Sequence, residues 1–233
     1  MEKILSLDSA AIAGLMFDSI SELSPAQQDL LFQTKKEQTF SALLANRLQK
    51  SQEPNNLSSF VELKGVEKLV KSTDKASIKK NRNTHDVCLI DDDAVFHLLL
   101  ENKVWYHFDG AKGRNNKRVN PDIENQLIPD IKKLTLTALD QPKSPRCFVL
   151  VNLVTPSDPS KLPSTYFGDH SKAFKRVKEQ VDVYRQDGVN GLKGILEKHS
   201  GKLLPVSQVS STNPLGVNGS ALLDVFCAEI NVK

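Results

Sequence analysis

Apolar residues follow two patterns along this chain. In residues 1–24 and from Pro25 to about Lys50 they recur every three or four positions, which predicts two helices. Ser24 and Pro25 suit the first positions of the second helix. Elsewhere they form short continuous runs, which predict the strands HDVCLI (85–90), VFHLLLENKVWYHF (95–108) and RCFVLVNLV (146–154). The first two strands are separated by a short acidic turn, so we expect an antiparallel pair.

The other segments complete a mixed pattern of helices and strands. Pro129 falls inside one predicted helix, where we expect a kink or a break. Residues 207–219 are rich in Ser, Asn and Gly. The remaining predictions are a strand at 60–70 interrupted by Gly65, an exposed basic stretch at 71–84, helices at about 121–139, 171–185 and 188–201, and a strand at 221–232. This order predicts a single α/β domain over residues 1–233.

Composition narrows the class of protein only slightly. Hydrophobic residues make up 39% and charged residues 25% of the chain, which is ordinary globular usage, and the net charge is +3. Three cysteines without CxxC spacing suggest neither a zinc site nor a disulfide framework, and fit a reducing cytoplasmic setting. We see no signal peptide and no stretch of the ~20 apolar residues that a membrane span needs, so no membrane association is expected.

Two charged residues interrupt the apolar run at 95–108. Glu101 and Lys103 are two positions apart, so on a strand they share a face, about 7 Å from each other. Asp86 opens the preceding strand, and Glu37 falls on the apolar stripe of the second helix. Convergent carboxylates suit Mg²⁺, and a nearby ammonium can act on an attacking water or stabilise negative charge on a phosphate. These residues therefore predict a metal-dependent phosphodiesterase site.

In this arrangement the chain resembles the PD-(D/E)XK nuclease superfamily over roughly residues 25–155, leaving 156–233 as a C-terminal extension. Asp86 matches the aspartate at a strand start, and Glu101-Asn102-Lys103 matches the acid-x-lysine motif. Residue 85 is His where the family name has Pro. The resemblance implies a restriction-endonuclease-like αβββαβ core. It also implies Mg²⁺, or Mn²⁺ as a substitute, bound by Asp86, Glu101 and Glu37, with Lys103 acting on the attacking water.

The resemblance further implies a DNA substrate, duplex rather than single-stranded, and allows a homodimer. The substrate-binding candidates are the polar residue Gln126 in the helix after the motif and, in the loop before that helix, Lys112, Arg114, Lys117 and Arg118. A restriction, defence or repair role would fit such an endonuclease. The alternative function is a catalytically silent nuclease-like fold that binds nucleic acid or a protein partner.

Each candidate residue also has a plainer interpretation. Glu101 and Lys103 could be an ion pair that protects an edge strand from aggregation, and Asp86 could be a turn residue. Glu37 could lie at the boundary of its helix stripe. A second acid-x-lysine, Glu62-Leu63-Lys64, stands on another predicted strand, but no aspartate opens a strand shortly before it.

Overall fold

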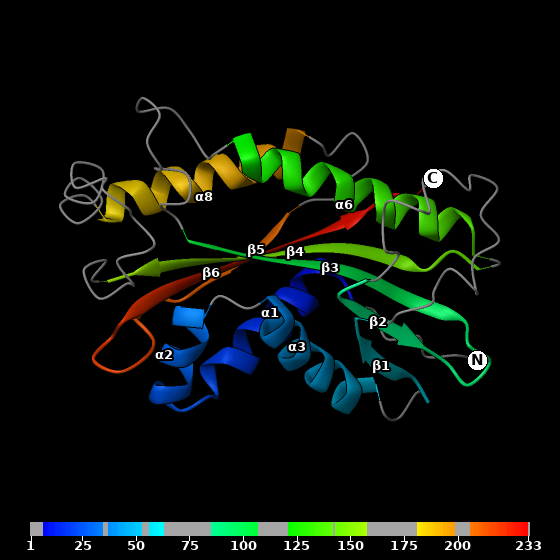
Figure 1. The fold of residues 1–233 in the computed structure, drawn as a ribbon, viewed down its shortest axis with the longest axis horizontal. Helices are drawn as coiled ribbons and strands as arrows, with labels where there is room; N and C mark the ends of the chain where they lie inside the picture. Colours follow the sequence, from blue (N-terminus) through cyan, green and yellow to red (C-terminus); the bar gives the residue numbers. More distant parts are fainter. Residues whose placement is uncertain are drawn as a thin grey trace.

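The computed structural model describes residues 7–34, 37–52, 56–62, 85–106, 121–141, 143–157, 181–198 and 206–232. These residues build a mixed six-stranded sheet with helices on both faces (Figure 1). The helices are α1 (Ser9–Ser21), α2 (Pro25–Thr34), α3 (Glu37–Gln52), α6 (Pro121–Leu139) and α8 (Val181–Lys198). The strands are β1 (Ser58–Val61), β2 (Val87–Ile90), β3 (Phe96–Tyr106), β4 (Arg146–Pro156), β5 (Ser207–Ser210) and β6 (Ala221–Ile230). The predicted α/β class is confirmed.

The sheet has the order β1-β2-β3-β4-β6-β5 and one parallel pair, β3 with β4. Its remaining pairs are antiparallel, including the predicted pair of β2 and β3. The short strand β2 begins at Val87, which lies opposite Leu100. Within the described ranges, the part of β3 beyond Leu100 therefore has its strand partner on the β4 side alone. The candidate site lies beside this part of β3.

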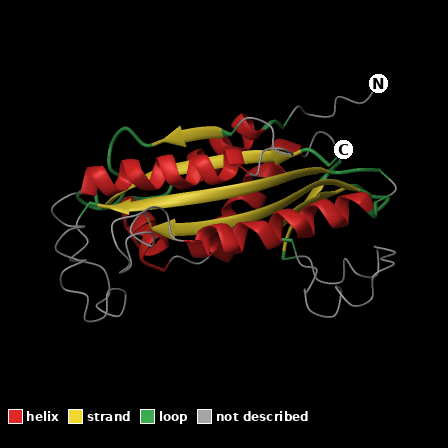
Figure 2. Cartoon of the chain, turned by 90° about the horizontal axis from the view of Figure 1, so that it is seen from above, coloured by secondary structure: helices red, strands yellow, loops and turns green. Residues whose placement is uncertain are grey.

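Alternate residues of β3 supply two separate cores, because side chains on a strand point to opposite faces. Leu98, Leu100 and Val104 join the core beneath α1 and α3, whereas Leu99 and Trp105 join the core beneath α6 and α8. Figure 2 shows helices lying along the strands. Each face of the sheet has its own core beneath them. Glu101 and Lys103 have the same parity as Leu99 and Trp105, so both start from the α6 face.

Several predicted elements need correction. The helix predicted from Pro25 to about Lys50 is two helices, one ending at Thr34 and the other beginning at Glu37. The segment rich in Ser, Asn and Gly, for which no strand is predicted, begins with β5, whose residues are alternately half-buried and exposed against β6. Pro129 does not end α6, which continues to Leu139, and Pro129 lies on the exposed side of the helix.

Other predicted elements differ in their bounds. The strand predicted at 60–70 is described only at its start, because β1 covers Ser58–Val61 and residues 63–84 lie outside the described ranges. The helix predicted at 188–201 is the second half of α8, and most of the helix predicted at 171–185 lies outside the described ranges. None of the described helices has both the length and the apolar character needed to cross a membrane.

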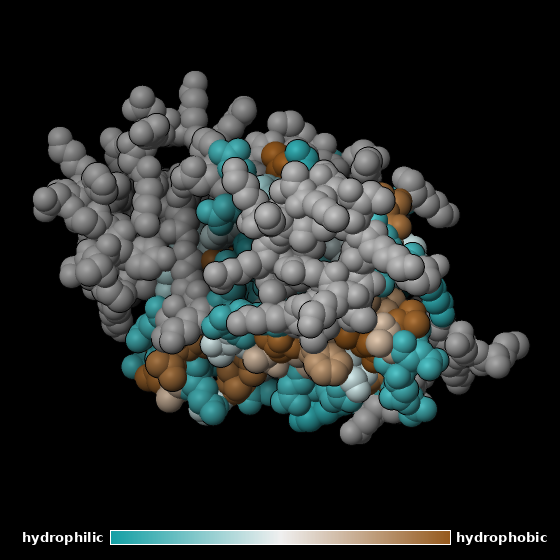
Figure 3. Space-filling model, turned by 45° about the vertical axis from the view of Figure 1, so that its right-hand side comes forward, coloured by the Kyte–Doolittle hydropathy of each residue, from teal (hydrophilic) through white to brown (hydrophobic). Residues whose placement is uncertain are grey.

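The surface shown in Figure 3 intermingles hydrophobic and hydrophilic side chains over the described residues. The large exposed apolar residues among those described come from four places in the chain, and two of them share α6: Leu30, Phe60, Leu136, Leu139 and Val217. Singly exposed apolar residues are ordinary on protein surfaces.

Packing of α3 on the sheet can be tested at Leu44, which is fully buried. We expect Leu44→Ala to lower the free energy of unfolding by about 2–5 kcal/mol, because a cavity remains beneath α3. Leu136→Ala, at a leucine that is 58% exposed, should change it by less than about 0.5 kcal/mol. Urea denaturation measures both, and equal effects would contradict the assigned burial.

Candidate functional site

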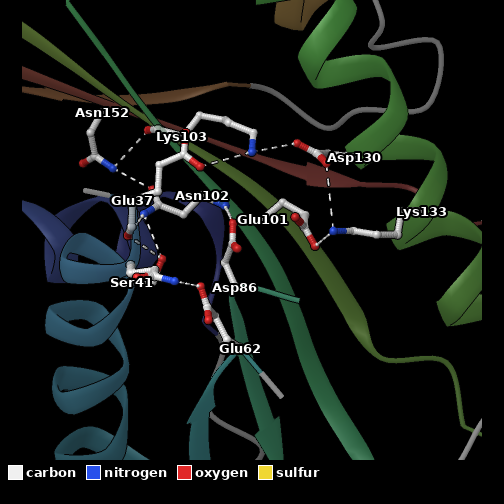
Figure 4. Close-up of polar contacts among 11 residues, drawn as sticks. Glu37, Ser41, Glu62, Asp86, Glu101, Asn102, Lys103, Asp130, Lys133 and Asn152 are labelled. Atoms are coloured by element: carbon white, nitrogen blue, oxygen red, sulfur yellow. Dashed lines mark hydrogen bonds and ion pairs between the residues drawn. The ribbon is translucent and has the colours of Figure 1, made fainter. Parts of the chain in front are cut away.

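Charged side chains from both helical layers meet beside β3, just beyond the start of β2 (Figure 4). Lys103 Nζ lies 3.4 Å from Glu37 Oε2 on α3 and 3.2 Å from Asp130 Oδ2 on α6. The two helices cover opposite faces of the sheet (Figure 1). One ammonium group can reach both helices because β2 no longer borders β3 here. Lys103 therefore links the two helical layers past the start of β2.

Glu101 is held in a buried polar cluster on the α6 face. Only 2% of its side chain is exposed, and its Oε1 lies 2.6 Å from Lys133 Nζ and 2.7 Å from His85 Nδ1. The other ring nitrogen of His85 lies 3.1 Å from Thr137 Oγ1. Burial and the nearby Lys133 lower the pKa of His85 to about 3, so the ring is neutral. When Glu101 is ionised, the proton of the ring lies on Nδ1, which donates to Glu101, and Nε2 accepts from Thr137.

Asp86 lies immediately before β2, and its Oδ2 accepts a hydrogen bond of 2.7 Å from the Asn102 backbone amide. Burial and the charge of Glu101 raise the pKa of Asp86 to about 6. Burial raises the pKa of Glu101 to about 7 even though Lys133 opposes that shift. Burial also raises the pKa of Glu37, against the effect of Lys103. Three carboxylates therefore hold their protons more tightly than they would in water.

Counted over the described residues alone, the charges of this cluster do not balance. Four carboxylates (Glu37, Asp86, Glu101 and Asp130) face two ammonium groups (Lys103 and Lys133), which leaves two formal negative charges in excess when every group is ionised. Buried charge without compensation is costly, and the raised pKa values express that cost. A divalent cation carries the charge that would balance this set.

A second polar chain lies on the α3 face and positions the cluster. Asn152 Nδ2 donates to Asn102 Oδ1 at 2.8 Å, and Asn102 Nδ2 donates to Ser41 Oγ at 3.0 Å and to the Glu37 carbonyl at 3.3 Å. Both asparagines are fully buried. The backbone amide of Asn102 holds Asp86 while its side chain holds the first turn of α3, which carries Glu37. The middle residue of the acid-x-lysine motif thus fixes two acids.

The structure brings the four predicted catalytic residues to one place but does not arrange them as a finished metal site. Glu101 faces Lys133, and Glu37 faces Lys103. Among the described residues, no three His, Cys, Asp or Glu side chains form a group that could hold a metal ion. The set still suits Mg²⁺ in its chemistry, because that ion takes few carboxylates and completes its shell with water and phosphate oxygens.

The predicted substrate-binding residues are placed only in part. Gln126 is exposed on α6, one turn before Asp130 on the same stripe of the helix. The predicted contacts Lys112, Arg114, Lys117 and Arg118 lie outside the described residues. In the second acid-x-lysine, Glu62 directly follows β1 and accepts a hydrogen bond of 2.6 Å from Gln38, while Lys64 lies outside the described residues.

Sequence reasoning missed Asp130, Lys133, His85 and Thr137. Three of them share a stripe on α6, because residues 126, 130, 133 and 137 are spaced by four, three and four. That stripe of polar residues, beside the apolar stripe of Leu127 and Leu134, was the signal in the sequence for the three residues on α6. No family model, curated protein or solved structure matches the chain.

The asparagine pair can be tested by a double-mutant cycle. Asn102→Ala should cost about 1–3 kcal/mol of unfolding free energy, because Asn152 and Ser41 each lose a buried hydrogen bond. Asn152→Ala should cost less when Asn102 is already alanine, with a coupling of about 0.5–3 kcal/mol. Additive costs in urea denaturation would show that the two amides do not act together.

The raised pKa of Glu101 predicts a dependence of stability on pH. The folded protein binds the proton more tightly than the unfolded chain, so stability falls as pH rises from 4.5 toward about 7. Glu101→Gln cannot ionise, so its stability should fall less over this range, while Asp86 keeps part of the fall. Melting temperatures across the range measure this. Glu197→Gln, at a glutamate on α8 that is 56% exposed, is the control, and the same slope in all three proteins would contradict the assigned environment.

Proposed function

We propose that this chain is a Mg²⁺-dependent endonuclease that hydrolyses phosphodiester bonds in DNA. The observation that carries the proposal is the cluster of four carboxylates and two ammonium groups where β2 begins beside β3. Lys103 of the acid-x-lysine motif lies at the centre of this cluster. The described element order α3-β1-β2-β3-α6-β4 agrees with the restriction-endonuclease-like core that the sequence resembles.

In this proposal Asp86 and Glu101 hold the metal ion, and Glu37 assists directly or through water. The ion supplies positive charge for the scissile phosphate and acidifies a bound water. The protein keeps its carboxylates close to one another by the Asn102 amide and the His85 ring. Because Asp86 and Glu101 have pKa values of about 6 and 7, a rise in pH through this range favours metal binding.

Lys103 acts in this scheme as a fixed positive charge rather than as a base. Burial disfavours its ammonium form, but Asp130, Glu37 and Asp86 outweigh burial and hold its pKa above the ordinary value. Lys103 is therefore protonated at neutral pH. A protonated ammonium can orient the attacking water and stabilise negative charge that develops on the phosphate.

Duplex DNA, a homodimer and a cytoplasmic location belong to the proposal through the sequence resemblance and the composition. Gln126 extends the α6 stripe of Asp130 and Lys133 toward the N-terminus of the helix and is itself exposed, which would suit contact with a substrate. A duplex has two strands to cut, which gives a physical reason for two copies of the chain. A role in restriction, defence or repair would follow from such cleavage.

A second candidate function has an observation in its favour. Glu101 is already satisfied by Lys133 and His85, and Glu37 by Lys103, as expected of a structural ion-pair network. In that case the chain would be a catalytically silent nuclease-like fold that binds nucleic acid or a protein partner. The two candidates differ in whether Mg²⁺ changes a DNA substrate.

Plasmid cleavage separates the two functions. We expect the protein to nick or linearise plasmid DNA in Mg²⁺ or Mn²⁺ but not in EDTA, and Lys103→Ala to lower the rate by about 10²–10³-fold, because a charge at the phosphate is lost. Lys132→Ala, at an exposed lysine on α6, should cleave at the wild-type rate. DNA that is retained in gel-shift assays but stays intact under all metals would favour the silent module.

A further inference from the structure

Of the positive charges in the part of the chain that the structure describes, Lys133 lies in direct contact with Glu101, the most buried acid of the cluster. Its Nζ lies 2.6 Å from Glu101 Oε1, and 15% of the Lys133 side chain is exposed. His85 also contacts this oxygen but is neutral, because burial and Lys133 lower its pKa. Lys103 makes its ion pairs with Glu37 and Asp130 instead. Among the described residues, Lys133 thus supplies the positive charge in direct contact with Glu101.

A divalent ion and Lys133 are both attracted by the negative charge of the Glu101 carboxylate. A metal ion is attracted by the full negative charge of the carboxylate, and an ammonium at hydrogen-bond distance already neutralises much of it. Burial strengthens this competition, because water screens the charges poorly there. Lys133 also has a second acid within reach, since Asp130 Oδ1 lies 3.9 Å from its Nζ on the preceding turn of α6. It therefore keeps a partner if a metal ion takes over Glu101.

We propose that Lys133 is a resident counter-ion that stabilises the metal-free site and competes with the divalent cation for Glu101. This inference rests on the proposed function, because it assumes a metal site that includes Glu101. Lys133 is a positioning residue in this account: it holds Glu101 in place in the absence of metal and sets the metal affinity lower than the carboxylates alone would give. Asp130 receives the ammonium when the metal is bound.

Two measurements on Lys133→Met test the inference without any activity assay. Isothermal titration calorimetry with Mn²⁺ should show about tenfold tighter binding than wild type, equal to about 1.4 kcal/mol. The metal-free variant should melt at a lower temperature than wild type, because Glu101 has lost its counter-ion, and Mn²⁺ should raise its melting temperature by more than it raises that of wild type. Lys132→Met, at the neighbouring exposed position, should match wild type in both measurements.

The outcomes separate this inference from the proposed function. Mn²⁺ that binds wild type but binds Lys133→Met equally or more weakly would overturn the counter-ion role and leave the metal site standing. Absence of Mn²⁺ binding by both proteins would overturn the metal site itself, and the inference with it. If Lys133→Met does not fold, Lys133→Gln takes its place with the same expected direction. In a Glu101→Gln background, removal of Lys133 should no longer tighten Mn²⁺ binding, and persistent tightening would contradict competition for Glu101.

Discussion

The ion pairs that Lys103 makes with Glu37 and Asp130 connect the helical layers on the two faces of the sheet. They join α3 and α6 from opposite sides of the sheet, at the part of β3 that β2 does not pair with. A charged side chain in this position needs partners, because it is largely removed from water. Among the described residues, its two acids belong to a cluster that holds four carboxylates and two ammonium groups. The charge of each group in this cluster therefore depends on the others.

The rest of the fold serves to hold this group in place. The parallel pairing of β3 with β4 sets Asn102 beside Asn152, and their amides fix the first turn of α3. The α6 stripe packs against the other face and delivers Asp130 and Lys133. A polar network inside a core is costly when any member lacks a partner. Each member of this network therefore depends on the hydrogen bonds and ion pairs of its neighbours.

Sequence patterns predicted the parts of this structure that depend on local periodicity. The apolar runs gave the strands containing Val87–Ile90, Phe96–Tyr106 and Arg146–Pro156 nearly correctly, and the two-residue spacing placed Glu101 and Lys103 on one face. The pattern could not say which way each carboxylate turns, because that depends on partners distant in sequence. Lys133 and His85 contact Glu101 from separate elements. The stripe of polar residues on α6 was visible, but its meeting with β3 was not.

The central claim is that the excess negative charge beside β3 binds one divalent cation. Crystals of the protein soaked in Mn²⁺ test it most directly, through the anomalous scattering of the ion. The account predicts a single strong peak within coordination distance of both Asp86 and Glu101, and none at this place in Asp86→Asn crystals treated in the same way. A peak elsewhere, or a site that stays empty while Lys133 remains on Glu101, would contradict it.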